Sequence, residues 1–359
     1  MNKKVKETAH YTHEGLLTNL KEHLTTKNIM VAAGLFLAVI LVVAARGKIV
    51  EAWQLLGQVN LKWLYLAFAM QIPSYYFVAK TYQALLATFG TKTNLKKMFE
   101  LSLALNFVNS VAPSAGVSGT SYFSYVLSRD KVPVGKSALV QVAKFVLTFS
   151  SFILILLVGG TLLYFSGDIQ RITVRIILLM VAAILVLCGG FIFAMLDRKR
   201  LDAMIHWLTD FIDKISGWVR KDNKPLIGRK KIEDLLNEFH GGFALIMGKR
   251  RRIIPPFMYV FATTFMEIAT VYLVFVAFSS IINPGIVIIA YGVANIAGVN
   301  FLPAGVGSYE AAMVAIFAAT GTPVALALSA TLVYRVVNMV LYLPVGFYFY
   351  QKNLVRKKV

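Results

Sequence analysis

The sequence predicts an all-α polytopic membrane protein, with six full spans and two re-entrant helical hairpins arranged as an inverted repeat. The first observation is composition, because 58% of the 359 residues are hydrophobic and the mean hydropathy is +0.68. The second is a set of long charge-free runs, each near the roughly 20 residues that a helix needs to cross a bilayer core. The third is a pair of similar helix-breaking motifs inside apolar sequence. Transmembrane β-strands would appear as alternating segments of about ten residues, which this sequence does not contain.

The two motifs interrupt the apolar sequence at matching positions. The first is NSVAPSAGVSGTSY, residues 109–122, and the second is NFLPAGVGSY, residues 300–309. The prolines at the two breaks, Pro113 and Pro303, are 190 residues apart. Interrupted helices at corresponding points of two halves are typical of transporters that bind their substrate near the bilayer midplane. We therefore expect both breaks to lie at the centre of the membrane.

Six spans and four short segments account for the apolar sequence. We expect the spans at residues 29–45, 63–89 with a kink at Pro73, 133–165, 174–196, 254–282 and 323–350. The first hairpin pairs residues 98–112 with 118–128, and the second pairs 286–298 with 308–320. Each of these segments is too short to cross a bilayer alone. The domains that follow are an N-terminal segment (1–28), a first repeat (29–165), a second repeat (166–350) and a tail (351–359).

The basic residues predict the orientation. The formal net charge is +20, and Lys and Arg gather in loops that fall on one side of the membrane if there are six spans. Because basic loops stay in the cytoplasm, both termini are expected inside, and the odd number of spans per repeat makes the second half inverted. The insert at residues 197–252 has apolar residues at helical spacing, which favours amphipathic helices on the cytoplasmic membrane surface; a solvated linker is the alternative.

The same pattern defines the expected partners. These are membrane phospholipids and the anionic lipid headgroups of the cytoplasmic face, with no nucleic acid, and an oligomer is left open. Cys188 is the single cysteine, so no disulfide can form within the chain. The sequence has no HExxH, GxSxG or P-loop motif and no acidic metal cluster, so we expect no catalytic residue, metal or cofactor.

Charges inside the spans indicate a binding site. Lys144 lies 11 residues after Pro133, and Arg335 lies 12 after Pro323, so both are roughly 16–18 Å into their helices. The expected substrate-binding residues are Lys144, Arg335, Glu310, Glu267, Asn109, Asn300, Gln141 and Asn338. The expected break residues are Pro113, Gly116, Gly119, Pro303, Gly305 and Gly307, whose glycines would allow close backbone approach. The alternatives are close helix packing at the glycines and a structural Glu310–Arg335 ion pair.

The motifs N-x-x-x-P-x-x-G and N-x-x-P-A-G-V-G-S-Y-E, each followed by a proline-started helix with a central basic residue, resemble a known family. It is the transmembrane flippase domain of the lysylphosphatidylglycerol synthases, and the resemblance covers about residues 29–350. It implies movement of aminoacylated phosphatidylglycerol to the outer leaflet, a role in lipid metabolism, and resistance to cationic antimicrobial peptides. Full-length members carry a C-terminal cytosolic lysyltransferase domain. Because residues 197–252 are too short for such a domain, we expect a stand-alone flippase.

The function expected from the sequence is therefore a lipid flippase of the bacterial inner membrane, or a carrier of another lipid-linked anion. One alternative is phosphatidylglycerol lysyltransferase activity, or a partner subunit of that enzyme. A further alternative is a membrane scaffold that transports nothing.

Overall fold

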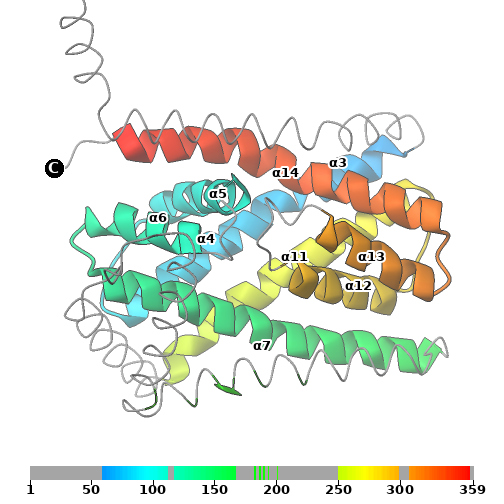
Figure 1. Cartoon of the computed structure of the whole chain (residues 1–359), viewed down its shortest axis with the longest axis horizontal. Coiled ribbons are helices and arrows are strands. Elements are labelled where there is room, and N and C mark those ends of the chain that lie inside the picture. The colour runs from blue at the N-terminus through cyan, green and yellow to red at the C-terminus, as the bar shows by residue number, and fades with distance from the viewer. Residues whose placement is uncertain are drawn as a thin grey trace, which may run out of the picture.

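The computed structural model describes residues 59–111, 117–166, 250–298 and 307–355, with isolated helical positions between 182 and 200. Helices and turns make up all of this part of the chain, which contains no strand (Figure 1). The helices are α3 (Leu61–Ala69), α4 (Gln71–Thr88), α5 (Leu95–Val111), α6 (Val117–Ser128), α7 (Val134–Ser166), the short 3₁₀ helix η2 (Arg250–Ile253), α11 (Ile254–Ala277), α12 (Pro284–Ala297), α13 (Ser308–Ala319) and α14 (Val324–Val355). The expected spans 29–45 and 174–196 and most of the insert lie outside the described residues.

Three of the described helices are long and apolar enough to cross a membrane. They correspond to the expected spans 133–165, 254–282 and 323–350, and the matching segments are Val134–Phe165, Arg251–Ala277 and Val324–Leu354. Pro133 and Pro323 directly precede the first residues of α7 and α14, as the sequence predicts. The protein is therefore an all-helical membrane protein in the part that the structure describes.

The expected span 63–89 is divided into two helices, α3 and α4, which meet at Met70. The cause is Pro73, because a proline has no N–H to donate and its ring collides with the carbonyl group four residues earlier. That carbonyl belongs to Ala69, the last residue of α3. The expected kink is thus present, but the chain bends at Met70 rather than at the proline itself.

Two helix ends differ from the expectation. The helix α11 ends at Ala277, five residues before the expected end, in a turn where Ser279 has φ 56°. The helix α14 continues to Val355. Asn283 is the N-cap residue of α12. Its side-chain oxygen accepts a hydrogen bond from the Gly285 N–H at 2.9 Å, and Pro284 is the first residue of the helix.

Helices α5, α6, α12 and α13 are too short to cross a membrane alone, and they form two pairs. Helices α5 and α6 have 17 and 12 residues, and α12 and α13 have 14 and 12. The longest of them reaches about 26 Å at 1.5 Å per residue, less than a hydrocarbon core of about 30 Å. The pair α5 and α6 lies towards one end of the bundle and the pair α12 and α13 towards the other (Figure 1).

The helix order repeats along the chain. Helices α5, α6 and α7 begin 189, 191 and 190 residues before α12, α13 and α14. The packing repeats too, since α5 packs against α14 while α12 packs against α7, and α4 packs against α11 between them. Each hairpin therefore contacts the long helix of the other half, and the halves interlock.

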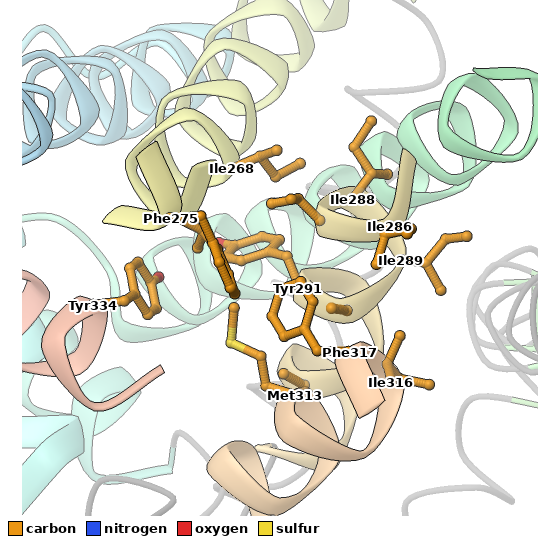
Figure 2. Close-up of a cluster of buried hydrophobic side chains, with 14 of the residues drawn as sticks. Ile268, Phe275, Ile286, Ile288, Ile289, Tyr291, Met313, Ile316, Phe317 and Tyr334 are labelled. Atoms are coloured by element: carbon orange, nitrogen blue, oxygen red, sulfur yellow. The ribbon is translucent and has the colours of Figure 1, made fainter. Parts of the chain in front are cut away.

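The two main hydrophobic clusters reflect this interlocking. One joins α11, α12 and α13 to the first part of α14 and the last part of α7 (Figure 2). Its centre includes Phe275 and Phe317, whose ring centroids are 4.5 Å apart. The other joins α4, α5 and α6 to the end of α14, where Phe107 lies 5.3 Å from Phe347 between ring centroids. Neither hairpin has a core made from its own half alone.

Glycines allow the closest contacts between the halves. A Cβ atom at Gly346 of α14 would lie 2.4 Å from the carbonyl oxygen of Leu103 in α5. A Cβ atom at Gly159 of α7 would lie 2.7 Å from the Ile288 side chain in α12. Small residues at such crossings let helix backbones approach in membranes, where packing rather than the hydrophobic effect holds helices together.

We predict that Gly346→Leu destabilises the bundle, because its Cβ atom cannot coexist with the Leu103 carbonyl at the present helix separation. Overpacking of this kind typically costs about 1–3 kcal/mol or more. The measurement is thermal unfolding of the purified protein in detergent. The control is Val340→Leu, at a half-exposed position of the same helix. Equal unfolding temperatures for the two variants would contradict the close contact.

The arrangement of the hairpins leads to a topology prediction. In a Cys188→Ser background, the variants Ile281→Cys and Thr322→Cys should both react with an impermeant thiol reagent added outside. The variant Lys96→Cys should react only after the membrane is permeabilised. Ile281 and Thr322 flank the pair α12 and α13, and Ile281 is 86% exposed. Labelling of Ile281→Cys and Thr322→Cys from opposite sides would show that this pair crosses the membrane.

Candidate functional site

A polar cavity of about 280 Å³ lies at the centre of the bundle. Residues of α4, α5, α7, α11, α12, α13 and α14 line it, so both halves contribute. Its polar lining includes Ser74, Tyr75, Thr81, Asn106, Lys144, Thr263, Glu267, Tyr291, Asn295, Tyr309, Tyr334, Arg335 and Asn338. So many polar groups inside a membrane are costly unless they form hydrogen bonds with one another, with water or with a ligand.

The helix α4 supplies one wall of the cavity through a polar stripe. Ser74, Val78 and Thr81 lie on one face of the helix, at spacings of four, three and seven residues, and they line the cavity together with Tyr75. Gln71 continues the stripe and donates a hydrogen bond to the Thr270 hydroxyl oxygen of α11 at 3.1 Å. The stripe therefore joins the two central helices as well as lining the site.

Lys144 lines the cavity from α7, and its nearest partner is a tyrosine. Its Nζ atom donates to the Tyr82 hydroxyl oxygen at 3.1 Å and lies 4.8 Å from the centroid of that ring. The Tyr82 hydroxyl donates in turn to Gln141 Oε1 at 3.0 Å. Within the described residues, Lys144 has no carboxylate partner. Its positive charge is thus available to an anion in the cavity.

Arg335 lines the cavity from α14 and is paired with a carboxylate. Its Nε atom lies 3.3 Å from Glu310 Oε1, and its guanidinium carbon lies 4.8 Å from the centroid of the Tyr309 ring. The other carboxylate oxygen, Oε2, accepts a hydrogen bond from the Gly307 N–H at 2.7 Å. Glu310 therefore satisfies the first turn of α13 and holds Arg335 at the same time.

Glu267 of α11 is the third charged residue of the cavity. Its carboxylate accepts hydrogen bonds from the hydroxyl of Ser74 at 2.7 Å, the hydroxyl of Tyr334 at 3.1 Å and the Nδ2 atom of Asn338 at 3.0 Å. These donors belong to α4 and α14, so one carboxylate joins three helices. Such donors stabilise a buried negative charge without neutralising it.

The structure brings together only part of the residue set expected from the sequence. Lys144, Arg335, Glu267 and Asn338 line one cavity. Gln141 and Glu310 are buried and do not line the cavity, but Gln141 contacts Tyr82, the partner of Lys144, and Glu310 contacts Arg335. Pro113, Gly116, Asn300, Pro303 and Gly305 lie outside the described residues.

Asn109, Gly119 and Gly307 have positions that differ from the expectation. Asn109 is exposed, does not line the cavity, and lies against α6, where a Cβ atom at Gly119 would be 2.2 Å from its side-chain oxygen. Gly119 therefore lets α6 pack closely on the Asn109 side chain. Gly307 makes no such contact, because a Cβ atom there would meet open space. Its φ of 100° is the reason for a glycine at that position.

Two asparagines that were not expected in the site also line the cavity. Asn106 and Asn295 are each the twelfth residue of their helices, α5 and α12, and both line the cavity. The Asn106 side chain donates to the Tyr75 hydroxyl oxygen at 2.7 Å, and that of Asn295 donates to the Tyr291 carbonyl oxygen at 2.9 Å. The offset of about 190 residues between the two motifs could have revealed this pair, because residues 106 and 295 are 189 positions apart.

The similarity to known proteins extends over most of the chain. The family model described as the lysylphosphatidylglycerol synthase TM region matches residues 29–346. The chain belongs to this family. The match includes every cavity-lining residue given above, so the cavity lies within the lysylphosphatidylglycerol synthase TM region.

Two relatives have similar sequences. A UPF0104 membrane protein of Methanocaldococcus jannaschii is 24% identical over 324 residues, which are 89% of this chain and 92% of the relative. A UPF0104 membrane protein of Methanothermobacter thermautotrophicus is 23% identical over 250 residues, which are 68% of this chain and 71% of the relative. Both are described as membrane proteins, which agrees with the helices found here.

We predict that Arg335→Gln lowers the free energy of unfolding by about 3–5 kcal/mol, because it leaves the buried Glu310 carboxylate without its cation. The double variant Arg335→Gln with Glu310→Gln should recover most of this loss, since the glutamine side chain keeps an acceptor for the Gly307 N–H. Thermal unfolding in detergent measures both effects. The control is Lys97→Gln, which breaks the more exposed ion pair with Asp130 and should cost less than about 1 kcal/mol. Equal losses in Arg335→Gln and Lys97→Gln would contradict a structural role for the buried pair.

Proposed function

We propose that this protein moves a phospholipid of the aminoacyl-phosphatidylglycerol type, or another lipid-linked anion, across the membrane. The observation that carries the proposal is the central cavity. It combines two cations at corresponding positions of two helices with a carboxylate, in the middle of an apolar bundle. Family membership supports a lipid-related role, because the family is defined on the transmembrane part of lipid synthases.

In this proposal Lys144 holds the phosphate of the lipid. An ammonium group that has only neutral partners is a point charge suited to a phosphate oxygen. Arg335 adds hydrogen-bond donors from the opposite half of the cavity, while Glu310 fixes its position. Glu267 accepts a headgroup amine or a coupling proton. The separated charges of Lys144 and Glu267 suit a headgroup that carries both a phosphate and an amine.

The size of the cavity fits a headgroup rather than a whole lipid. Pockets for drug-sized ligands have volumes of about 300–1,000 Å³, and this one is at the lower limit. A polar headgroup would pass through the protein while its acyl chains remain in the bilayer. This division of the lipid avoids moving a phosphate through hydrocarbon.

The proposal includes the topology expected from the sequence. It places six full spans and two re-entrant hairpins in a cell membrane, the inner membrane in a bacterium, with both termini in the cytoplasm. The repeated packing of α5 on α14 and α12 on α7 supports an inverted pair of repeats. In transporters with such repeats, one bundle moves against the other around a central site. The substrate site would then open to each side in turn.

We predict that Lys144→Gln slows lipid movement by about 10- to 100-fold with little change in stability. The variant removes a charged hydrogen bond to the lipid, worth about 1.5–3 kcal/mol, but leaves no unpaired carboxylate behind. The measurement is the transfer rate of fluorescent phosphatidylglycerol between leaflets of proteoliposomes.

The matched control for this prediction is Lys136→Gln, on the same helix but outside the cavity. It should transport at the rate of the unmodified protein. Lys144→Arg should keep part of the activity, because it keeps the charge. A fully active Lys144→Gln protein would refute the phosphate role of Lys144, whereas an unmodified protein that moves no lipid would favour a membrane scaffold that transports nothing.

A further inference from the structure

A second pocket, of about 430 Å³, lies away from the central cavity. It is bounded by the last turns of α4, the loop that follows, and the first turn of α11. The residues that define it are Lys80, Gln83, Lys92, Thr93, Pro255 and Tyr259. The two pockets share no lining residue. We call the second one the outer pocket.

The wall of the outer pocket is built by the chain after α4. Gly90 adopts the left-handed conformation, with φ 78°, and the Thr91 N–H donates to the Leu86 carbonyl oxygen at 2.9 Å, which ends the helix in a Schellman motif. The Gln83 side chain then donates to the Thr93 carbonyl oxygen at 2.9 Å. The loop is thus fastened back onto α4, and this places Lys92 and Thr93 beside Lys80.

The outer pocket has positive charge that no carboxylate neutralises. Lys80 and Lys92 make no ion pair among the described residues, and no carboxylate lines the pocket. Two other lysines at this end of the bundle are paired, since Lys97 contacts Asp130 and the Lys352 Nζ atom lies 2.9 Å from Glu100. Lys80 and Lys92 instead face one pocket without a carboxylate, and an anion is the ligand that they suit.

One further group in the outer pocket lacks a hydrogen bond. The Thr93 hydroxyl oxygen is buried and has no hydrogen-bond partner in the described part of the chain. Pro255 and Pro256, in the first turn of α11, have no N–H, so this helix terminus offers few backbone donors. Recognition in this pocket must therefore come from the side chains. This makes it testable by substitution of the two lysines.

The surroundings of the outer pocket are apolar. Ile254 and Met258, beside Pro255 and Tyr259 on α11, are 59% and 54% exposed. The Tyr259 ring stacks on Phe77 of α4, with 6.3 Å between centroids. Lys80 is half-buried, and its Nζ atom lies 5.7 Å from the centroid of the Tyr76 ring. A basic pocket flanked by aromatic rings and exposed aliphatic side chains is typical of the boundary between headgroups and acyl chains.

We propose that the outer pocket binds the phosphate of an anionic phospholipid, with the acyl chains lying against the exposed apolar surface of α11. Lys80 and Lys92 hold the phosphate oxygens. Basic pockets between transmembrane helices bind anionic headgroups in this manner. The site does not depend on transport, because it needs neither Lys144 nor the central cavity.

The test uses the full-length protein purified in a mild detergent and titrated with dioleoyl-phosphatidylglycerol. Native mass spectrometry counts the lipids bound to each molecule. The double variant Lys80→Gln with Lys92→Gln should bind one lipid about 30-fold more weakly, since each lysine near an anionic headgroup contributes roughly fivefold. The variant Lys80→Arg with Lys92→Arg should keep the affinity, and thermal unfolding reports that all variants are folded.

The matched control is Lys96→Gln with Lys136→Gln, which removes the same charge outside both pockets. This double variant should bind the lipid as the unmodified protein does. An equal loss in the two double variants would show that only the net charge matters and would overturn the site. No loss in either variant would overturn it as well.

Two further titrations identify the source of the phosphate. Inorganic phosphate in place of the lipid should bind at least about tenfold more weakly, because it lacks acyl chains. Equal affinity would make the site one for free phosphate and overturn the lipid proposal. Dioleoyl-phosphatidylcholine should bind more weakly than phosphatidylglycerol, because its ammonium group opposes the lysines. Transport by Lys144→Gln is measured separately, so failure of one proposal leaves the other intact.

Discussion

The carboxylate of Glu267 sets the strictest requirement in this structure, because a charge at the centre of an apolar bundle must be hydrogen-bonded. Ser74 from α4 and Tyr334 and Asn338 from α14 meet that requirement. The crossing of α4, α11 and α14 is therefore fixed at one point by polar contacts. Around it, glycines such as Gly346 allow the helices to pack at close range. The hydrogen bonds to Glu267 and the close helix contacts at glycines together determine where the cavity lies.

The two halves have corresponding helices but different charged residues. Each contributes a cation on its long helix and an asparagine on the first helix of its hairpin. The carboxylates Glu267 and Glu310 both belong to the second half, so Arg335 has an ionic partner and Lys144 has Tyr82. A repeat fold with identical halves would give two equivalent half-sites. Here the difference leaves one cation for a ligand and uses the other partly to hold the protein together.

The sequence predicted the features that depend on periodicity and on proline. Pro133 and Pro323 mark the positions after which α7 and α14 begin. The spacing of Lys144 and Arg335 from these prolines places both at similar depth, and both line one cavity. Features that depend on tertiary contacts were harder to predict. The exposure of Asn109 and the hydrogen bonds from Ser74 and Tyr334 to Glu267 depend on how the helices pack. The role of Gly307 was missed because a sequence does not reveal the sign of φ.

The outer pocket and the central cavity lie on the same pair of helices. On α4, Val78 and Thr81 line the cavity, while Lys80 and Gln83 line the outer pocket, so adjacent faces of one helix serve the two sites. On α11, Tyr259 lines the outer pocket and Val260 lines the cavity. A phosphate held by Lys80 would be only a few helical positions from a cavity whose available cation is Lys144. Moving an anion between two positive sites requires less desolvation energy than moving it directly from water into the bundle. Under the two proposals, a headgroup released from the outer pocket would reach the cavity along the seam between α4 and α11.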